Sequence, residues 1–280
     1  YAQAYFDYDS KKSGGVTMSH LRFGKSPIKS TYLIRQANFV ACHNPSYVDK
    51  YNMVKELVDG GTFLLNCSWD MEGLEEHLPG QVKSYIANHN IKFYTIDGIK
   101  IGKEIGLGGR INTVLQSAFF KLAAIIPEEE AIDLMKAAAK ATYGRKGDKI
   151  VQMNYDAIDA GAKQVVEIAV PESWKDAADE GLTTPHVGEG GRADVVDFVK
   201  NIQAKVNAQE GNTLPVSAFN EYVDGSTPSG SSAYEKRGIA VDIPIWQPDN
   251  CIQCNRCAYV CPHAVIRPIA LTEEEAANAP

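Results

Sequence analysis

Four cysteines near the carboxyl end constrain this chain more than any other feature of its sequence. They are Cys251, Cys254, Cys257 and Cys261, spaced C-x2-C-x2-C-x3-C, and Pro262 follows the last of them. This is the spacing of bacterial runs that bind [4Fe–4S] clusters, in which the fourth cysteine can serve a second cluster. Two-residue gaps let three thiolates on one tight loop converge on a single cluster. The run therefore predicts an electron-transfer site with these four cysteines as metal ligands.

Zinc and purely structural thiols are the alternatives for this group. A zinc site usually pairs two C-x2-C arms that lie about a dozen or more residues apart. The chain has no second arm of this kind, so we favour iron–sulfur ligation. We expect His20, His43 and His263 not to be metal ligands. His263, two residues after the last cysteine, is expected to face solvent at the start of a helix.

Composition limits the class of protein. The chain has 280 residues, of which 44% are hydrophobic and 22% charged, and a net charge of -7. These values predict a globular protein of one large or two smaller domains and argue against a nucleic-acid binder. No apolar run approaches the roughly 18 residues of a membrane span, and Tyr1 does not begin a basic and apolar leader. We therefore expect neither a membrane segment nor a signal peptide.

The two remaining cysteines suggest a buried role. Cys42 and Cys67 each end an apolar run. Free cysteines commonly behave as small buried hydrophobic residues. We expect that behaviour here and no redox function. A thiolate cluster motif also favours a reducing compartment, which predicts a cytoplasmic protein.

The middle of the chain alternates between strand and helix patterns. Near-continuous apolar segments at 37–42, 62–67 and 92–96 predict buried strands. Helices are predicted from about 45 to 58, closed by two glycines, and near 79–88. Such alternation indicates an α/β fold with a mainly parallel sheet and flanking helices on both faces. Ligands in such sheets bind at the carboxyl ends of the strands.

More helices are predicted after the third strand. They cover about 111–126, a segment that starts at Pro127 and ends near Gly144, and a segment capped by Asp148. The glycine-rich stretch 106–110 is either a phosphate loop or a break between helices, and we favour the break because no strand precedes it.

The chain changes character after residue 170. Residues 171–192 are rich in proline, glycine and charge, and a short apolar helix is predicted at 193–206. Residues 225–232 have the composition of a flexible linker, which leads into an extended arm before the cysteines.

A basic island lies near the amino end. Strands are predicted at 4–8 and 16–24, and the loop between them is Lys11-Lys12-Ser13-Gly14-Gly15. Backbone N–H groups of Ser-Gly-Gly can form an anion-binding nest, to which the lysines would add charge. The alternative is a hairpin turn with solvated lysines. The residues alone leave both open.

Several landmarks occur together in a characteristic order. They are residues 8–17, residues 20–25, Glu235-Lys236-Arg237-Gly238, and Trp246-Gln247-Pro248 directly before the cysteine run. In this order the chain resembles the middle of the pyruvate:ferredoxin (flavodoxin) oxidoreductases. The resemblance implies an N-terminally truncated γ domain of the 2-oxoacid oxidoreductases (1–170), a Glu-Lys-Arg connector (171–244) and the start of a two-cluster ferredoxin-like α+β module (245–280). It also implies that the chain is an internal fragment of a longer enzyme.

The resemblance carries further expectations. It implies oxidative decarboxylation of pyruvate with coenzyme A to acetyl-CoA and CO2, with electrons passing through 4Fe-4S clusters to ferredoxin or flavodoxin. Thiamine diphosphate and Mg2+ would be bound by other domains of the enzyme, so no catalytic residue is expected in this chain and the chain alone should be inactive. The family also implies a homodimer. Because the γ domain helps to hold coenzyme A in the single-chain enzymes, Lys11, Lys12, Ser13, Gly14 and Gly15 become candidates for binding its phosphates.

Two other classes of function compete with this one. The chain could be a free-standing electron carrier that joins a ferredoxin module to an unrelated α/β partner-binding domain. It could instead be a structural protein stabilised by zinc. Only the enzyme requires a second cysteine run and a thiamine-binding domain in the same polypeptide.

Overall fold

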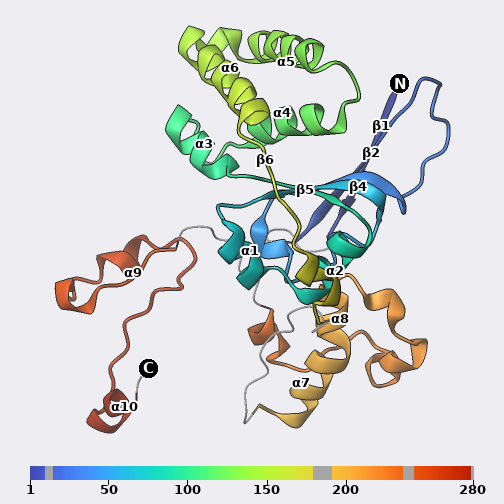
Figure 1. The fold of residues 1–280 in the computed structure, drawn as a ribbon. Helices are drawn as coiled ribbons and strands as arrows, with labels where there is room; N and C mark the ends of the chain where they lie inside the picture. Colours follow the sequence, from blue (N-terminus) through green and yellow to red (C-terminus); the bar gives the residue numbers. More distant parts are fainter. Residues whose placement is uncertain (10–14, 179–190, 236–242, 279–280) are drawn as a thin grey trace. The chain divides into compact units, whose positions relative to one another are not determined.

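The computed structural model describes residues 1–9, 15–178, 191–235 and 243–278. The chain divides into two compact units, Tyr1–Ile239 and Ala240–Pro280. The first unit contains the sheets and most of the helices (Figure 1).

A four-stranded sheet forms the centre of the first unit. Its order is β3-β4-β5-β6, parallel between β3 and β4 and between β4 and β5, and antiparallel between β5 and β6. The strands are β3 (Ala37–Cys42), β4 (Leu57–Asn66), β5 (Lys92–Ile96) and β6 (Val166–Glu167). The mainly parallel α/β sheet predicted from the sequence is confirmed, and the short strand β6 was not predicted.

Both faces of the sheet are buried by helices. Phe63, Leu64 and Leu65 follow one another in β4 and are all at most 1% exposed. Phe63 and Leu65 belong to the apolar cluster under α1 (Met71–His77) and α2 (Gly80–Asn88), whereas Leu64 belongs to the cluster on the other face. The helices on that other side are α3 (Gly98–Ile105), α4 (Asn112–Ala123), α5 (Glu128–Tyr143) and α6 (Asp148–Lys163), with α5 packed on α4 and α6 (Figure 1). Burial on both faces explains why residues 63–65 are all apolar instead of alternating with polar residues.

The prediction of a helix from about 45 to 58 is wrong. The chain makes a 3-10 turn at Pro45–Tyr47, continues through turns, and enters β4 at Leu57, so the glycine pair 60–61 lies inside a strand. Val48 and Val54 are both 1% exposed and belong to the same core cluster. The turns between Tyr47 and Leu57 bring both side chains into this core without a helix. Tertiary packing therefore overrides the local helix signal.

The ends of the other helices follow local signals. Asp70 caps α1, a helix that was not predicted, by accepting a hydrogen bond from Gly73 N. Helix α5 begins after Pro127 with three glutamates in its first turn and is capped by Gly144, as predicted. Helix α6 starts at Asp148, but Gly147 and not Asp148 occupies the N-cap position.

The segment after β6 packs back onto the sheet. Trp174 lies in a 3-10 turn (Glu172–Asp176), is 1% exposed and belongs to the cluster of α1 and α2. Its indole N–H donates to Glu75, and the carbonyl of Lys175 accepts from the Asn88 side chain. A Cβ atom on Gly80 would lie 1.7 Å from the Ala178 carbonyl oxygen, so this close approach requires glycine. The domain boundary at residue 170 remains a prediction, and this segment packs with the α/β core.

The rest of the first unit contains a helical segment and a ribbon. Helix α7 (Ala193–Phe198), a π-helical turn (Val199–Gln203) and α8 (Ala204–Asn207) follow one another without a break. Phe198 and its neighbours form a small core with Tyr222 and Tyr234.

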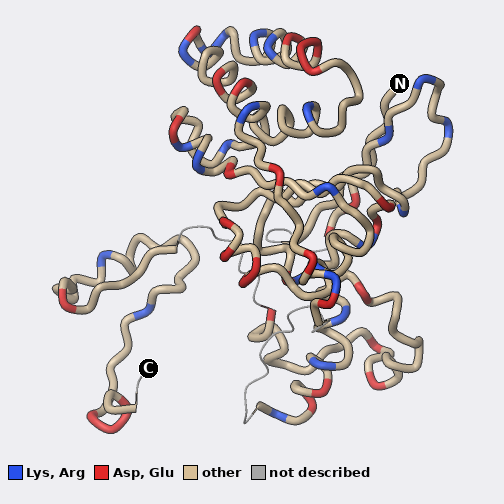
Figure 2. Tube along the Cα trace, viewed as in Figure 1, with Lys and Arg blue, Asp and Glu red and all other residues tan. Residues whose placement is uncertain are grey.

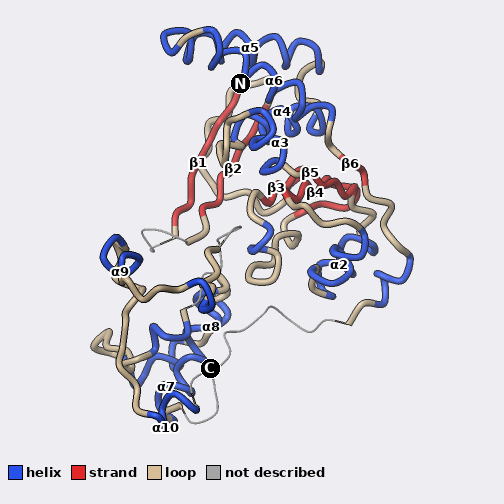
Figure 3. Tube along the Cα trace, turned by 90° about the vertical axis from the view of Figure 1, so that its left-hand side faces the viewer, coloured by secondary structure: helices blue, strands red, loops and turns tan. Residues whose placement is uncertain are grey.

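Strands β1 (Ala2–Tyr8) and β2 (Thr17–Phe23) form a separate two-stranded antiparallel ribbon (Figure 3). Both strands of this ribbon were predicted.

The second unit is small and irregular. Its described residues form a 3-10 turn (Pro248–Asn250), α9 (Arg256–Val260) and α10 (Glu273–Ala277), and contain no strand. The last helix has a capping box, in which Thr272 and Glu275 bond each other's backbone N–H groups. Across the part of the chain that the structure describes, no helix combines the length and apolarity needed to cross a bilayer.

Replacing Trp174 by alanine should unfold the first unit more easily. Because the ring is 1% exposed and lies against the sheet, Trp174→Ala should lower the free energy of unfolding by about 3–5 kcal/mol. Chemical denaturation followed by circular dichroism measures this. Trp246→Ala is the control, since Trp246 is 72% exposed in the second unit. Equal losses in both variants would show that Trp174 does not act as a core residue.

Candidate functional site

The four clustered cysteines lie on the loop around α9. Cys251, Cys254 and Cys257 are exposed, Cys261 is half-buried, and none is in a disulfide. The backbone around Cys254 is tightly curved, because Gln253 (φ 55°) and Asn255 (φ 56°) both adopt the left-handed conformation. Helix α9 starts directly after Asn255, which places Cys257 in its first turn. The local sequence thus forms a compact turn with thiols on and beside it.

Hydrogen bonds to sulfur favour the thiolate forms of two of these cysteines. The backbone at Gln253, and then the Trp246 side chain, lower the pKa of Cys251. Backbone groups, first that of Val265 and then that of His263, lower the pKa of Cys261. Thiolates are the ligands of iron–sulfur clusters, and hydrogen bonds to the sulfurs tune such clusters. In the sequence interpretation Trp246 was only a landmark, and its contact with Cys251 was missed.

The described residues do not gather the four sulfurs into a cage. Among them no three or more His, Cys, Asp or Glu side chains are arranged to hold a metal ion. The assignment of these cysteines as ligands therefore stays a prediction. The donor set itself fits an iron–sulfur cluster, because it consists of free thiols, two with lowered pKa, on a tight turn with N–H donors.

The histidines are placed as follows. His20 Nδ1 accepts a hydrogen bond from Ile34 N at 3.1 Å. Burial lowers the pKa of His43. His263 is exposed, as predicted, but lies in a turn and not at a helix start. That none of the three binds a metal remains a prediction.

The candidate coenzyme A loop is only partly described. Lys11, Lys12, Ser13 and Gly14 lie outside the described residues. Gly15 is half-buried, and its carbonyl oxygen accepts a hydrogen bond from the Tyr47 hydroxyl at 3.4 Å. Beside it, Asp9 N donates to Val16 O at 3.1 Å and closes the ribbon. The contact of Tyr47 with this loop had no signal in the sequence, because 32 residues separate the two partners.

The carboxyl ends of the three parallel strands are joined by one buried amide. Asn66 is 3% exposed. Its Nδ2 donates to His43 O and its Oδ1 accepts from Gly98 N, both at 2.9 Å. The side chain therefore links the segments that follow β3 and β5. The sequence interpretation missed it, because an asparagine at the end of an apolar strand looks like ordinary loop punctuation.

The two isolated cysteines are buried, as predicted, and both lie at this edge of the sheet. Cys42 is 2% and Cys67 is 6% exposed. Burial raises the pKa of Cys42 to about 12 and that of Cys67 to about 11. Both thiols are therefore protonated at neutral pH, the form that does not act as nucleophile or metal ligand.

The glycine-rich stretch 106–110 forms a break between helices, as favoured. Gly106 ends α3 in the left-handed conformation (φ 91°). The N–H groups of Leu107 and Gly108 both donate to Gly102 O, at 2.8 and 3.1 Å. Because these donors are already bonded, they are not available to a phosphate.

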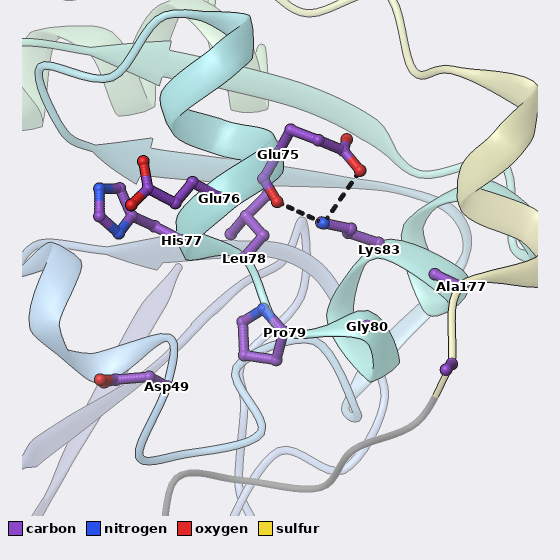
Figure 4. A pocket seen from close by; sticks show the side chains of 10 residues that line it. Asp49, Glu75, Glu76, His77, Leu78, Pro79, Gly80, Lys83 and Ala177 are labelled. Atoms are coloured by element: carbon purple, nitrogen blue, oxygen red, sulfur yellow. Dashed lines mark hydrogen bonds and ion pairs between the residues drawn. The ribbon is translucent and has the colours of Figure 1, made fainter.

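A polar hollow lies between α1 and α2 (Figure 4). Within it Lys83 forms an ion pair with Glu75 at 3.1 Å and also bonds the Glu75 carbonyl oxygen. Figure 2 shows acidic residues on α1 and at the start of α5. Glu75 and Lys83 thus compensate each other, and the carboxylates of Asp49 and Glu76 also line the hollow.

Comparison with known families assigns three consecutive parts of the chain. Residues 1–164 match the family described as pyruvate ferredoxin/flavodoxin oxidoreductase. Residues 189–240 match a domain of unknown function, and residues 243–266 match a 4Fe-4S binding domain. The third match includes all four clustered cysteines.

Individual relatives align along the whole chain. It is 53% identical over 280 residues to a pyruvate-flavodoxin oxidoreductase of Enterobacter agglomerans and 52% identical to a pyruvate:ferredoxin oxidoreductase of Moorella thermoacetica. Each alignment covers 100% of this chain and 23% of the relative. A solved pyruvate oxidoreductase subunit of Thermotoga maritima covers 59% of this chain and 80% of its own, at 18% identity and a TM-score of 0.45. The chain thus spans about a quarter of the length of the Enterobacter and Moorella relatives.

Serine replacement tests the cluster ligands. Cys251→Ser, Cys254→Ser and Cys257→Ser should each abolish the electron paramagnetic resonance signal of one reduced 4Fe-4S cluster in anaerobically purified protein. Cys67→Ser is the control and should keep the signal. A normal reduced spectrum in all three variants would refute the assignment, and a colourless zinc-loaded protein would establish the zinc alternative.

Alkylation tests the two buried cysteines. At pH 8 a thiol with a pKa of about 12 is ionised in only roughly one molecule in ten thousand. In the cluster-free chain we expect Cys42 and Cys67 to react with iodoacetamide at least about 100-fold more slowly than the four clustered thiols. Peptide mass spectrometry measures each rate, and unfolding should equalise all six. Fast labelling of either residue in the folded chain would contradict its burial.

Proposed function

Because the chain belongs to the pyruvate ferredoxin/flavodoxin oxidoreductase family, we propose that it forms part of an enzyme that oxidises pyruvate. The enzyme decarboxylates pyruvate with coenzyme A to acetyl-CoA and CO2 and passes the electrons to ferredoxin or flavodoxin. The single observation that carries this proposal is the order of the three matched parts, oxidoreductase domain, connector and 4Fe-4S domain. Relatives named for flavodoxin and for ferredoxin match the whole chain at 53% and 52% identity.

The second unit has the electron-transfer role in this proposal. Cys251, Cys254 and Cys257 hold one 4Fe-4S cluster, and Cys261 serves a second. A bound cluster accepts and releases single electrons. The donors that lower the pKa of Cys251, the Gln253 backbone and the Trp246 side chain, would orient and stabilise its sulfur as a ligand.

The first unit has a binding role. Lys11, Lys12, Ser13, Gly14 and Gly15 bind phosphate groups of coenzyme A through lysine charges and backbone N–H groups. The bond from Tyr47 to Gly15 supports this, because it fixes one end of the loop beside the residues that follow β3. Ligands of parallel sheets bind at this carboxyl end of the strands.

The remaining parts of the enzyme complete the reaction in this proposal. Thiamine diphosphate and Mg2+ are bound by domains outside these 280 residues, so this chain supplies no catalytic residue. The enzyme is a homodimer in the cytoplasm. Its free thiolates suit a reducing compartment, and its net charge of -7 does not suit nucleic acid as a partner.

Anaerobic turnover tests the whole proposal. The longer polypeptide that contains this chain should reduce ferredoxin or flavodoxin only when both pyruvate and coenzyme A are present. A free-standing electron carrier would exchange electrons without either compound, and a zinc protein would exchange none. Reduction that is independent of pyruvate would overturn the proposal.

Neutralising the two lysines tests the coenzyme A loop. Each charge-assisted contact contributes about 1.5–3 kcal/mol, so Lys11→Ala/Lys12→Ala should raise the KM for coenzyme A roughly ten- to a hundredfold per lost contact. Decarboxylation of pyruvate in the absence of coenzyme A should be nearly unchanged, because it does not need this loop.

The matched control is Lys25→Ala/Lys29→Ala, which removes two exposed lysine charges that follow β2 and lie outside the loop. Steady-state kinetics with coenzyme A and pyruvate each varied measures the KM for both substrates in both double variants. An unchanged coenzyme A dependence in the Lys11/Lys12 variant would reduce the loop to a hairpin turn.

A further inference from the structure

The β1–β2 ribbon has two chemically different faces. Because side chains alternate along each strand, the register places Phe6 opposite Ser19 and Ala4 opposite Leu21 on one face. We call this the apolar face, and it consists of Ala2, Ala4, Phe6, Tyr8, Thr17, Ser19, Leu21 and Phe23. None of its residues is charged. The opposite face, here the mixed face, carries Gln3, Tyr5, Asp7, Met18, His20 and Arg22.

The mixed face is the one that the rest of the chain covers. The segment that follows β2 folds back over it. Ile34 N donates to His20 Nδ1, Arg22 donates to Ser30 O, and the Arg22 guanidinium lies 3.9 Å from the centre of the Tyr32 ring. The polar residues of the mixed face, such as Asp7 and His20, are half-buried as a result.

The apolar face is left open. Phe6 is 48%, Tyr8 71%, Leu21 42% and Phe23 42% exposed. Phe6 and Tyr8 lie side by side with ring centroids 6.3 Å apart, and Phe23 reaches Phe119 of α4 at 6.1 Å. An antiparallel ribbon with one covered face normally turns its apolar side chains toward the cover and its polar side chains toward water, because burying apolar surface is favourable. Here the arrangement is inverted, with polar groups covered and aromatic rings exposed.

We propose that the apolar face is a docking surface for an uncharged, apolar surface of another domain of the same longer polypeptide. Contiguous exposed apolar patches in proteins usually mark interaction sites, whereas single exposed apolar residues do not. An isolated two-stranded ribbon is also at best marginally stable in water, so a cover would stabilise this one. The proposal rests on the proposed function only in that both place the chain within a longer polypeptide.

The size of the face argues against a second copy of this chain as the cover. The large side chains of the face, three aromatic rings and Leu21, are 42–71% exposed and offer roughly 300–400 Å². A stable interface between separate molecules buries about 800 Å² on each partner. A domain in the same polypeptide needs less area, because the link supplies a high effective concentration. The relatives that cover the whole chain are long enough to contain such a domain, since the chain makes up only 23% of each.

The chemistry of the face argues against an electron acceptor protein as the cover. Transient encounters between proteins are steered by complementary charge. The eight residues of the apolar face carry none. An apolar partner that remains in place fits better than one that must dissociate after each turnover.

Hydroxyl-radical footprinting of the intact, unmodified enzyme tests this inference. Neighbouring residues of β1 provide an internal comparison, because Phe6 (48%) and Tyr5 (51%) are equally exposed aromatic residues on opposite faces. In the complete polypeptide Phe6, Tyr8 and Leu21 should be oxidised at least fivefold more slowly than in the 280-residue chain, and Tyr5 and Tyr32 at similar rates in both. Equal oxidation of Phe6 in the two forms would overturn the proposal.

Two further outcomes are decisive. Protection of Phe6 in the 280-residue chain that increases with concentration would show a second copy as the occupant and overturn the proposal. Phe6→Lys should lower the Tm of the complete enzyme more than Tyr5→Lys does. In the 280-residue chain the two variants should have the same Tm. Equal Tm shifts in the complete enzyme would also overturn the proposal. These measurements use no substrate, so a loss of pyruvate activity and a failure of docking are separate results.

Discussion

The two-sided burial of β4 is the constraint on which most of the first unit depends. Phe63 and Leu65 point to one side of the sheet and Leu64 to the other, and none has access to water. Each side therefore requires its own layer of helices. One layer comes from α3 to α6, and the other from α1 and α2. The second layer is completed only when Trp174 returns from beyond β6.

The same constraint positions the groups at the carboxyl end of the sheet. With both faces covered, the strand ends are the part of the sheet where polar side chains can gather. Asn66 uses both ends of its amide to link the segments after β3 and β5. Tyr47, in the 3-10 turn that follows β3, donates a hydrogen bond to Gly15 in the loop that precedes β2. The buried thiols of Cys42 and Cys67 lie at this edge as packing groups, because burial keeps them protonated.

The second unit follows a different principle, because it has almost no core of its own. Its cysteines are mostly exposed, and its described residues contain short helices and turns. Small modules of this kind commonly take their stability from bound metal. This explains why the unit is marked so clearly in the sequence by ligand spacing and so little by hydrophobic periodicity. The inverted ribbon of the first unit also lacks a complete core, and the cover that we propose for it is a protein surface.

The sequence by itself determined the features that depend on local chemistry. The strands β3 and β5, the helices α2 and α5, the cysteine run and the family were all predictable, because apolar runs, caps and ligand spacing act over a few residues. Tertiary structure alone decided the features that depend on distant partners. The segment after Pro45, predicted as a helix, folds into turns that bury Val48 and Val54 in one core, and Asn66, Tyr47 and Trp174 bond residues 23, 32 and 99 positions away. Which face of the β1–β2 ribbon is covered was decided in the same way, because the alternation of a strand defines two faces and only packing selects between them.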